Sequence, residues 1–187
     1  NMLLSPDLSI NFSKAHMLSP DGRCFTFDAR ANGFVRGEGC GALVLRTGAS
    51  AVGRGVGYAT VAGDGANEDG RTKSMTMPCG NAQIDVMATT HKRFGVPPDS
   101  VVFFEAHGTG TVAGDAAEFS GLRMAFEESG REDKGWCALG SVKSQIGHTK
   151  AAAGAAGLFK AVMAIRHGVL PPTAKIDQPN PKMGIDD

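Results

Sequence analysis

The strongest hydrophobic runs of the chain lie in its second half. Residues 100–108, SVVFFEAHG, form a continuous apolar run of strand length between turn signals, which is typical of a strand covered on both faces. Residues 137–143, CALGSVK, repeat this pattern. Two earlier segments predict further strands that could line a sheet: Ala42–Leu45, and a strand that runs into a polar glycine loop within residues 56–69.

Helical spacing separates these runs. Apolar residues recur at helical intervals in residues 81–94, which the sequence GVPP then ends. A second helix is expected to begin near Asp115, and a third to run from Ala151 to His167, closed by Gly168. The small side chains of this third helix would let it lie close to another backbone, so we expect it to be buried between sheets; an alanine-rich surface helix is the alternative. The alternation of strands and helices predicts an α/β layered fold.

Composition narrows the classes of function. The chain has 187 residues, of which 42% are hydrophobic, so a single domain with a real core is expected. Its 19 basic and 19 acidic side chains balance, which argues against binding to nucleic acid or to an anionic membrane. No apolar run reaches the ~20 residues of a membrane span, and the first residues lack the features of a signal peptide, which predicts a cytoplasmic or organellar protein.

The four cysteines are scattered and predict reduced thiols, without disulfides or a metal site: Cys24, Cys40, Cys79 and Cys137.

Both strongly apolar runs lead into glycine turns that carry histidine. His107 follows the first, and the second delivers Lys143 and then His148. Because the carboxyl ends of strands form the ligand crevice of α/β proteins, these side chains could converge. Two neutral imidazoles donating Nε2–H to one oxygen would stabilise an enolate or oxyanion, and a nearby lysine would oppose their protonation. A lone histidine after a strand is more often structural, but two in glycine turns with a lysine favour a site.

Four segments of the chain match one known family. They are SPDGRCFTFDARANGFVRGEGCG at residues 19–41, EAHGTGT at 105–111, VKSQIGHTKAAAG at 142–154 and LPPT at 170–173. Together they resemble the β-ketoacyl synthase (ketosynthase) domain of type I polyketide synthases, in the thiolase superfamily. The resemblance implies a partial thiolase-like layered αβαβα fold, with residues 1–50 ending the N-terminal half and residues 51–187 forming most of the C-terminal half.

The resemblance also implies a reaction. In this family an acyl group on a cysteine is attacked by the enolate that forms when malonyl-acyl carrier protein loses carbon dioxide. His107 and His148 match the catalytic histidines, and Lys143 matches the active-site lysine. The supporting residues of this site would be Glu118, which would orient Lys143 directly or through a water, and Asp115, Thr109 and Thr111. No bound cofactor is implied beyond the phosphopantetheine arm of the acyl carrier protein, and the partners would be that carrier, acyl and malonyl thioesters and a second copy in a homodimer.

The chain departs from the family pattern at three places. Lys150 stands where the family usually has glutamate, which resembles ketosynthases of polyunsaturated-fatty-acid and enediyne-type synthases, and Ala116 replaces a proline. None of the four cysteines has the context of the family's nucleophile, which we expect upstream of Asn1. The fragment alone is therefore predicted to be inactive.

Two other interpretations remain at this stage. A catalytically silent ketosynthase-like subunit would contribute only dimer surface and the wall of the acyl pocket. A phosphate-binding loop is suggested by GEGCG and HGTGTVAGD, but their spacing fits neither GxGxxG between a strand and a helix nor a loop with the GK[ST] lysine.

Overall fold

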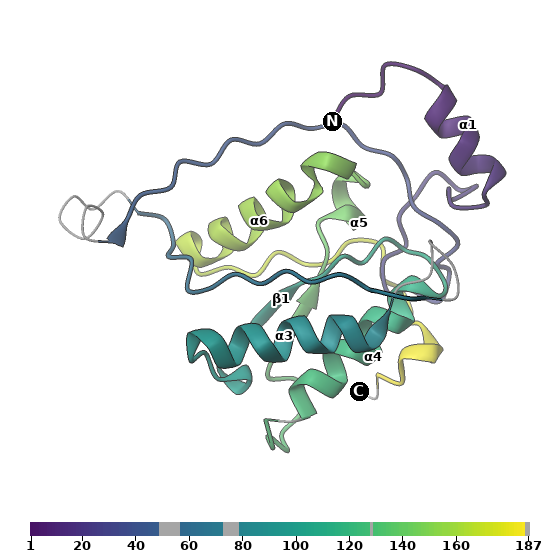
Figure 1. Ribbon diagram of the computed structural model, residues 1–187. Helices are drawn as coiled ribbons and strands as arrows, with labels where there is room; N and C mark the ends of the chain where they lie inside the picture. The colour runs from purple at the N-terminus through teal and green to yellow at the C-terminus, as the bar shows by residue number, and fades with distance from the viewer. Residues whose placement is uncertain (49–56, 73–78, 128, 186–187) are drawn as a thin grey trace.

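The computed structural model describes residues 1–48, 57–72, 79–127 and 129–185 (Figure 1). The predicted boundary at residues 50 and 51 lies outside this described part. Its helices and strands, in chain order, are α1 (Asp7–Lys14), α3 (Gly80–Phe94), η1 (Pro98–Ser100), β1 (Phe103–Glu105), α4 (Gly114–Glu127), β2 (Ala138–Gly140), α5 (Lys143–Ile146), η2 (Lys150–Ala152), α6 (Ala153–His167) and η3 (Pro181–Met183).

A small parallel sheet lies between helices. Strands β1 and β2 pair in parallel, with Phe104 opposite Leu139. Helix α6 covers one side of the sheet and helices α3 and α4 lie on the other (Figure 1). Successive side chains of β1 point to opposite faces, so Phe103 lies toward Lys160 of α6, while the Phe104 ring packs edge-on against Phe126 of α4. This arrangement confirms both strongly apolar strands and the layered α/β class.

Residues from distant parts of the chain form the core on the α4 side. Its buried members are Phe27, Ala106 and Met183, and partly buried apolar residues pack around them: Phe104, Phe119, Leu139 and Ile176. The core therefore ties the glycine-rich N-terminal segment to the end of β1, where the first candidate histidine follows.

The three predicted helices are confirmed. Helix α3 spans Gly80–Phe94, α4 begins at Gly114, and α6 spans Ala153–His167. The residues that follow α3 and α6, Gly95 and Gly168, both adopt φ +63°. This left-handed conformation suits glycine and ends a helix, as the sequence predicted.

The two earlier strands were predicted wrongly. Residues 42–45 form no strand, and Val44 is 87% exposed. Val56 lies outside the described residues. The remainder of the predicted strand and glycine loop, residues 57–69, runs without strand structure beside α3, where the Asn67 side-chain amide donates to the Ala82 carbonyl over 2.6 Å. A strand needs a neighbour for its N–H and C=O groups, and the described part of the chain offers these segments none.

Helix α6 is buried on one side only. Its buried residues are Gly157, Lys160 and Ala164, which lie on the side facing β1. On the other side Phe159 and Ile165 are 63% and 67% exposed. Within this chain, the predicted burial between sheets therefore holds for one face of the helix. None of the described helices is both long and apolar enough to cross a bilayer.

Candidate active site

The two candidate histidines meet at the carboxyl end of the sheet. His107 lies two residues beyond the end of β1, and His148 lies beyond β2 and the short helix α5. Their ring centroids are 5.2 Å apart, with the planes at 87°, so the rings pack edge to face. Lys143, the first residue of α5, is only 5% exposed. The structure thus brings both imidazoles together, as the sequence predicted.

Hydrogen bonds to the main chain hold the loop that carries His107. The Glu118 carboxylate accepts the His107 N–H over 2.6 Å with Oε1 and the Gly108 N–H over 2.8 Å with Oε2. The Gly108 carbonyl accepts from the hydroxyls of Thr26 and Ser141. Gly108 has φ +41°, and a Cβ there would lie 2.7 Å from the Ser141 Cβ. Only glycine therefore fits this turn without displacing its neighbours.

The second loop is tied to the N-terminal segment of the chain. The His148 N–H donates to the Val35 carbonyl over 2.7 Å, and the His148 carbonyl accepts the Gly37 N–H over 3.0 Å. This parallel bridge places His148 beside residues 34–37. The Phe34 ring packs edge-on against the His148 ring, with 5.4 Å between centroids. Residues 19–41 are therefore part of the site and not only of its surroundings.

The predicted direct contact between Glu118 and Lys143 is not formed. The ion pairs of the described residues do not include these two, and both Glu118 oxygens are engaged by main-chain N–H groups. The charges are still close enough to interact, since burial raises the pKa of Glu118 and Lys143 acts to lower it. A water-mediated contact stays a prediction.

The remaining supporting residues also hold the first loop. Asp115 is fully buried, and its carboxylate accepts the Phe27 N–H over 2.8 Å and the Gly110 N–H over 3.0 Å. Burial raises the pKa of Asp115 to about 6, although these hydrogen bonds act to lower it. The hydroxyls of Thr109 and Thr111 lie 3.3 Å apart. These contacts fix the backbone between β1 and α4.

The surroundings keep both histidines neutral near pH 7. The His107 residue is partly open to solvent, yet burial of its ring, followed by the charges of Lys143 and Lys150, lowers its pKa to about 4. Burial, then Lys150, then His107 and Lys143 lower the pKa of His148 to about 3. Burial also lowers the pKa of Lys143, while nearby glutamates act to raise it.

The tautomer of His148 follows from its neighbour. The Lys150 main-chain N–H donates to Nδ1 of His148 over 3.2 Å. In a neutral ring, Nδ1 is then the acceptor and Nε2 carries the proton. His148 can therefore donate one hydrogen bond from Nε2 to a ligand oxygen.

Two charged clusters behind the loops were missed from the sequence. Lys160 of α6 pairs with Glu105 of β1 over 2.8 Å, and the other Glu105 oxygen accepts the Val142 N–H over 2.5 Å. The signal was present, since Glu105 is a carboxylate inside an apolar strand and Lys160 lies among the small residues of a helix.

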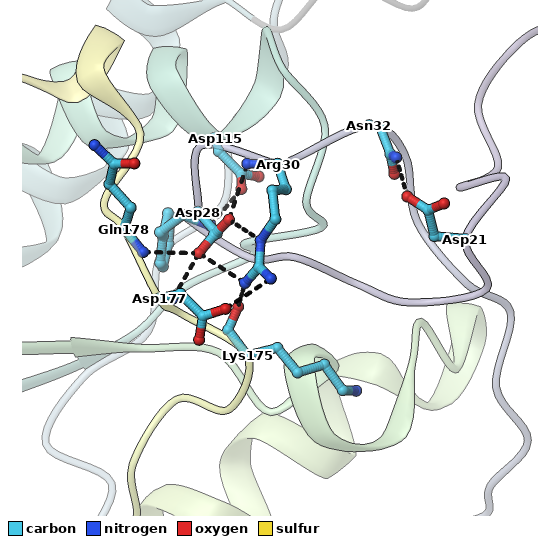
Figure 2. A network of polar contacts seen from close by, with 9 residues as sticks. Asp21, Asp28, Arg30, Asn32, Asp115, Lys175, Asp177 and Gln178 are labelled. Carbon is cyan, nitrogen blue, oxygen red and sulfur yellow. Dashed lines mark hydrogen bonds and ion pairs between the residues drawn. The ribbon is translucent and has the colours of Figure 1, made fainter.

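The second cluster centres on Asp28, as Figure 2 shows. The buried Asp28 carboxylate accepts from the Arg30 guanidinium and from the main-chain N–H groups of Asp177 and Gln178. Burial alone would raise the pKa of Asp28, but these hydrogen bonds hold it well below its usual value. The cluster ties the segment around Phe27 to residues 175–180.

One cysteine supports the site: the Val35 N–H donates to the Sγ of Cys24 over 3.1 Å, in the segment that binds the His148 loop. All four are free thiols; Cys24 is buried and its pKa is raised by burial, as is that of Cys137. A raised pKa disfavours the thiolate that a nucleophile needs. Among the described residues, no group of histidine, cysteine, aspartate and glutamate has the arrangement of a metal site.

Comparison with known proteins agrees with this geometry. Residues 1–51 match the family "Beta-ketoacyl synthase, N-terminal domain", and residues 58–177 match "Beta-ketoacyl synthase, C-terminal domain". The chain is 43% identical to Polyketide synthase PksL of Bacillus subtilis over 96% of its own length and 4% of that protein. It is 48% identical to a phenolphthiocerol/phthiocerol polyketide synthase of Mycobacterium tuberculosis, again over 96% of this chain and 10% of the relative.

Solved structures show the same fold. The ketosynthase from module 6 of the bacillaene synthase of Bacillus subtilis superposes with a TM-score of 0.94 at 42% identity, over 97% of this chain and 32% of that one. An oxazolomycin ketosynthase domain of Streptomyces albus gives a TM-score of 0.91 at 36% identity, over 98% of this chain and 32% of that one. The chain therefore spans about a third of these ketosynthase structures. It belongs to the β-ketoacyl synthase family, with the thiolase-like fold of its ketosynthase domains.

Proposed function

We propose that this chain supplies the enolate-forming part of a ketosynthase active site, within a protein that condenses an acyl-enzyme thioester with malonyl-acyl carrier protein. The observation that supports this most strongly is the edge-to-face pair of neutral histidines at the carboxyl end of the sheet. The thioester carbonyl oxygen of the malonyl group would accept Nε2–H from His148 and a second hydrogen bond from His107.

The reaction that follows uses these donors where charge develops. Cleavage of the bond to the carboxylate releases carbon dioxide and leaves its electron pair in an enolate, whose oxygen becomes negative. Two hydrogen bonds and the Lys143 ammonium would stabilise that charge. The enolate carbon then attacks the acyl thioester of a cysteine, and the cysteine leaves as thiolate while the β-ketoacyl product stays on the carrier.

The loops are built to hold these donors still. Glu118, Asp115 and Glu105 each fix main-chain N–H groups next to a site residue. Preorganised donors gain their advantage because they need no rearrangement as the charge forms. The expected partners are an acyl carrier protein, whose phosphopantetheine arm presents the malonyl group, and a second copy of the protein.

The proposal predicts where an acyl group attaches. In the full-length protein, incubation with an acyl thioester should modify a cysteine outside residues 1–187, and mass mapping of peptides should find the adduct there. Cys24 and Cys137 should stay unmodified, because Cys24 is buried and burial raises the pKa of both thiols. The proposal also expects no adduct on Cys40 or Cys79 that turns over to product.

Addition of malonyl-acyl carrier protein should then convert the adduct to a β-ketoacyl product. An adduct on one of the four cysteines that turns over to product would contradict the proposal. Failure of any cysteine to load, together with absence of carbon dioxide release, would instead support a catalytically silent ketosynthase-like partner.

A further inference from the structure

The Lys150 ammonium sits in an aromatic cage beside the candidate site. Its Nζ lies 3.8 Å from the centroid of the Phe34 ring and 4.2 Å from that of Phe12, a residue of α1. Both distances fall within the ~6 Å over which a ring face attracts a cation. The ion pairs found in the described part of the chain do not include Lys150. Two rings therefore hold this charge, without a neutralising carboxylate.

The cage shares a wall with His148. The Phe34 ring contacts the Lys150 ammonium with its face and packs edge-on against the His148 ring, 5.4 Å away between centroids. Lys150 also adopts φ +47°, a left-handed conformation that is uncommon for a residue with a side chain. In this conformation its main-chain N–H reaches Nδ1 of His148 while its side chain reaches the cage.

We propose that Lys150 is a positioning residue that keeps His148 neutral with its proton on Nε2. The main-chain N–H of Lys150 fills the Nδ1 lone pair, and the caged ammonium opposes a second proton on the same ring. This role rests on the proposed function, because it concerns the imidazole that would donate to the enolate oxygen.

The main-chain N–H and the side-chain ammonium of Lys150 both oppose the same event, protonation of His148 at Nδ1. A proton on Nδ1 would turn the acceptor into a donor that faces the Lys150 N–H, so the hydrogen bond would be lost. It would also place a second positive charge beside the ammonium. In agreement with this, Lys150 follows burial as the next cause of the lowered pKa of His148.

The other charged groups near the two histidines are mainly cations, which oppose protonation as Lys150 does, whereas an anion would favour it. Glu118 is the acidic member of the set that surrounds the two histidines, and its oxygens are engaged by the N–H groups of His107 and Gly108. Burial and then Arg36 lower the pKa of Lys150 itself. The set, taken from every element around His148, is His107 after β1, Glu118 of α4, Lys143 of α5, Lys150 of η2 and Arg36 of the N-terminal segment.

The test is the pH profile of carbon dioxide release from a malonyl thioester by the full-length protein, read together with the NMR titration of the His148 ring, which separates its protonation from that of His107. Lys150→Met keeps the apolar stem and the main-chain N–H but removes the charge. It should move the acidic midpoint to higher pH by roughly 0.5 to 1.5 units, and Lys150→Glu should move it further. Lys150→Arg, which keeps the charge, should return the midpoint toward wild type. Lys92→Met, which removes an exposed lysine of α3, should leave the profile unchanged.

A second variant, in α1, tests the same role of Lys150 without changing the loop that carries His148. Phe12→Leu opens the cage from α1 and leaves the charge in place, so it should shift the midpoint in the same direction by less. Midpoints that stay at the wild-type value in Lys150→Met, Lys150→Glu and Phe12→Leu would overturn the inference. A merely structural role would lower the rate equally at every pH.

Loss of the proposed function gives a different result. If His148→Ala releases carbon dioxide as fast as wild type, the proposed function fails and no profile of a Lys150 variant is needed to show it. If His148→Ala is slow but the Lys150 profiles coincide with wild type, only the role of Lys150 fails.

Discussion

Two carboxylates beside the histidines, one buried and one half-buried, accept hydrogen bonds from main-chain N–H groups. Asp115 and Glu118 each bind two such groups from the loop around His107 or from the segment it packs on. An acceptor of this kind fixes backbone position directly, whereas a cation on a long side chain fixes only the end of that side chain. The position of His107 therefore depends on the acidic residues of α4.

Asp115→Asn tests this dependence. An amide offers one acceptor oxygen, so one of the two N–H groups from Phe27 and Gly110 loses its partner, at a cost of about 1–3 kcal/mol. Hydrogen exchange of the peptides that contain these two N–H groups should speed up accordingly in the variant. Unchanged protection of both peptides would show that the carboxylate does not hold the loop.

The same substitution changes the pH dependence of local stability. The pKa of Asp115 in the folded protein, about 6, lies above the value of ~3.9 expected for an unfolded chain. The folded state thus binds the Asp115 proton more tightly than the unfolded state does. The stability that this proton adds to the fold is complete below pH ~4 and is lost as pH rises through about 6. Local stability measured by hydrogen exchange should fall over this range in wild type and stay flat in Asp115→Asn.

At the scale of elements, one buried ion pair joins both strands to α6. Glu105 of β1 pairs with Lys160 of α6, and its second oxygen holds the Val142 N–H, next to Lys143. The side chains are 11% and 5% exposed. Such a pair is costly to break from one side, because the remaining charge stays buried without a partner.

Lys160→Met should therefore destabilise the packing of α6 on the sheet by about 3–5 kcal/mol. Hydrogen exchange of α6 and β1 in the full-length protein would report it. The matched control is Arg123→Ala, which breaks an ion pair with Glu127 whose side chains are both 59% exposed and should cost less than about 1 kcal/mol. Equal losses of stability in the two variants would show that the buried pair stabilises the fold no more than the exposed pair does.

The same scale shows what the sequence could predict. Helices α3, α4 and α6 and the two central strands have local signals, namely helical spacing, glycine stops and continuous apolar runs, and all five were found. The strand at residues 42–45 was predicted from an apolar run alone, and in the structure this segment has no partner strand among the described residues. Apolar side chains indicate burial or pairing but do not say where the partner lies.

The candidate site also contains parts that the sequence could predict and parts that it could not. His107, His148 and Lys143 follow strong strands in glycine turns, so their convergence could be predicted. The Phe12 and Phe34 cage could not, because it joins α1 to a residue more than 100 positions away, and no local pattern records such a contact. A contact of Glu118 with Lys143, direct or through a water, was expected from the family resemblance, whereas both Glu118 oxygens accept main-chain N–H groups.

For the whole molecule, the chain is about a third of the ketosynthase structures it matches. It presents apolar side chains to solvent along the extended segment and on the outer face of α6: Leu43, Val44, Leu45, Leu158, Phe159 and Ile165. Its histidine pair is nevertheless complete, with both loops held by contacts inside the chain. Under the proposed function, this part of the protein would form the enolate and a cysteine outside it would take the acyl group.

Carbon dioxide release from a malonyl thioester, measured without an acyl donor in the full-length protein, tests this assignment most directly. His107→Ala and His148→Ala should each slow release by ~10² to 10³, the loss typical of one oxyanion donor. Replacement of the acyl-accepting cysteine should leave release measurable, and His167→Ala, on the exposed last turn of α6, should match wild type. Release that stays within a few-fold of wild type in folded His107→Ala and His148→Ala would contradict the central claim.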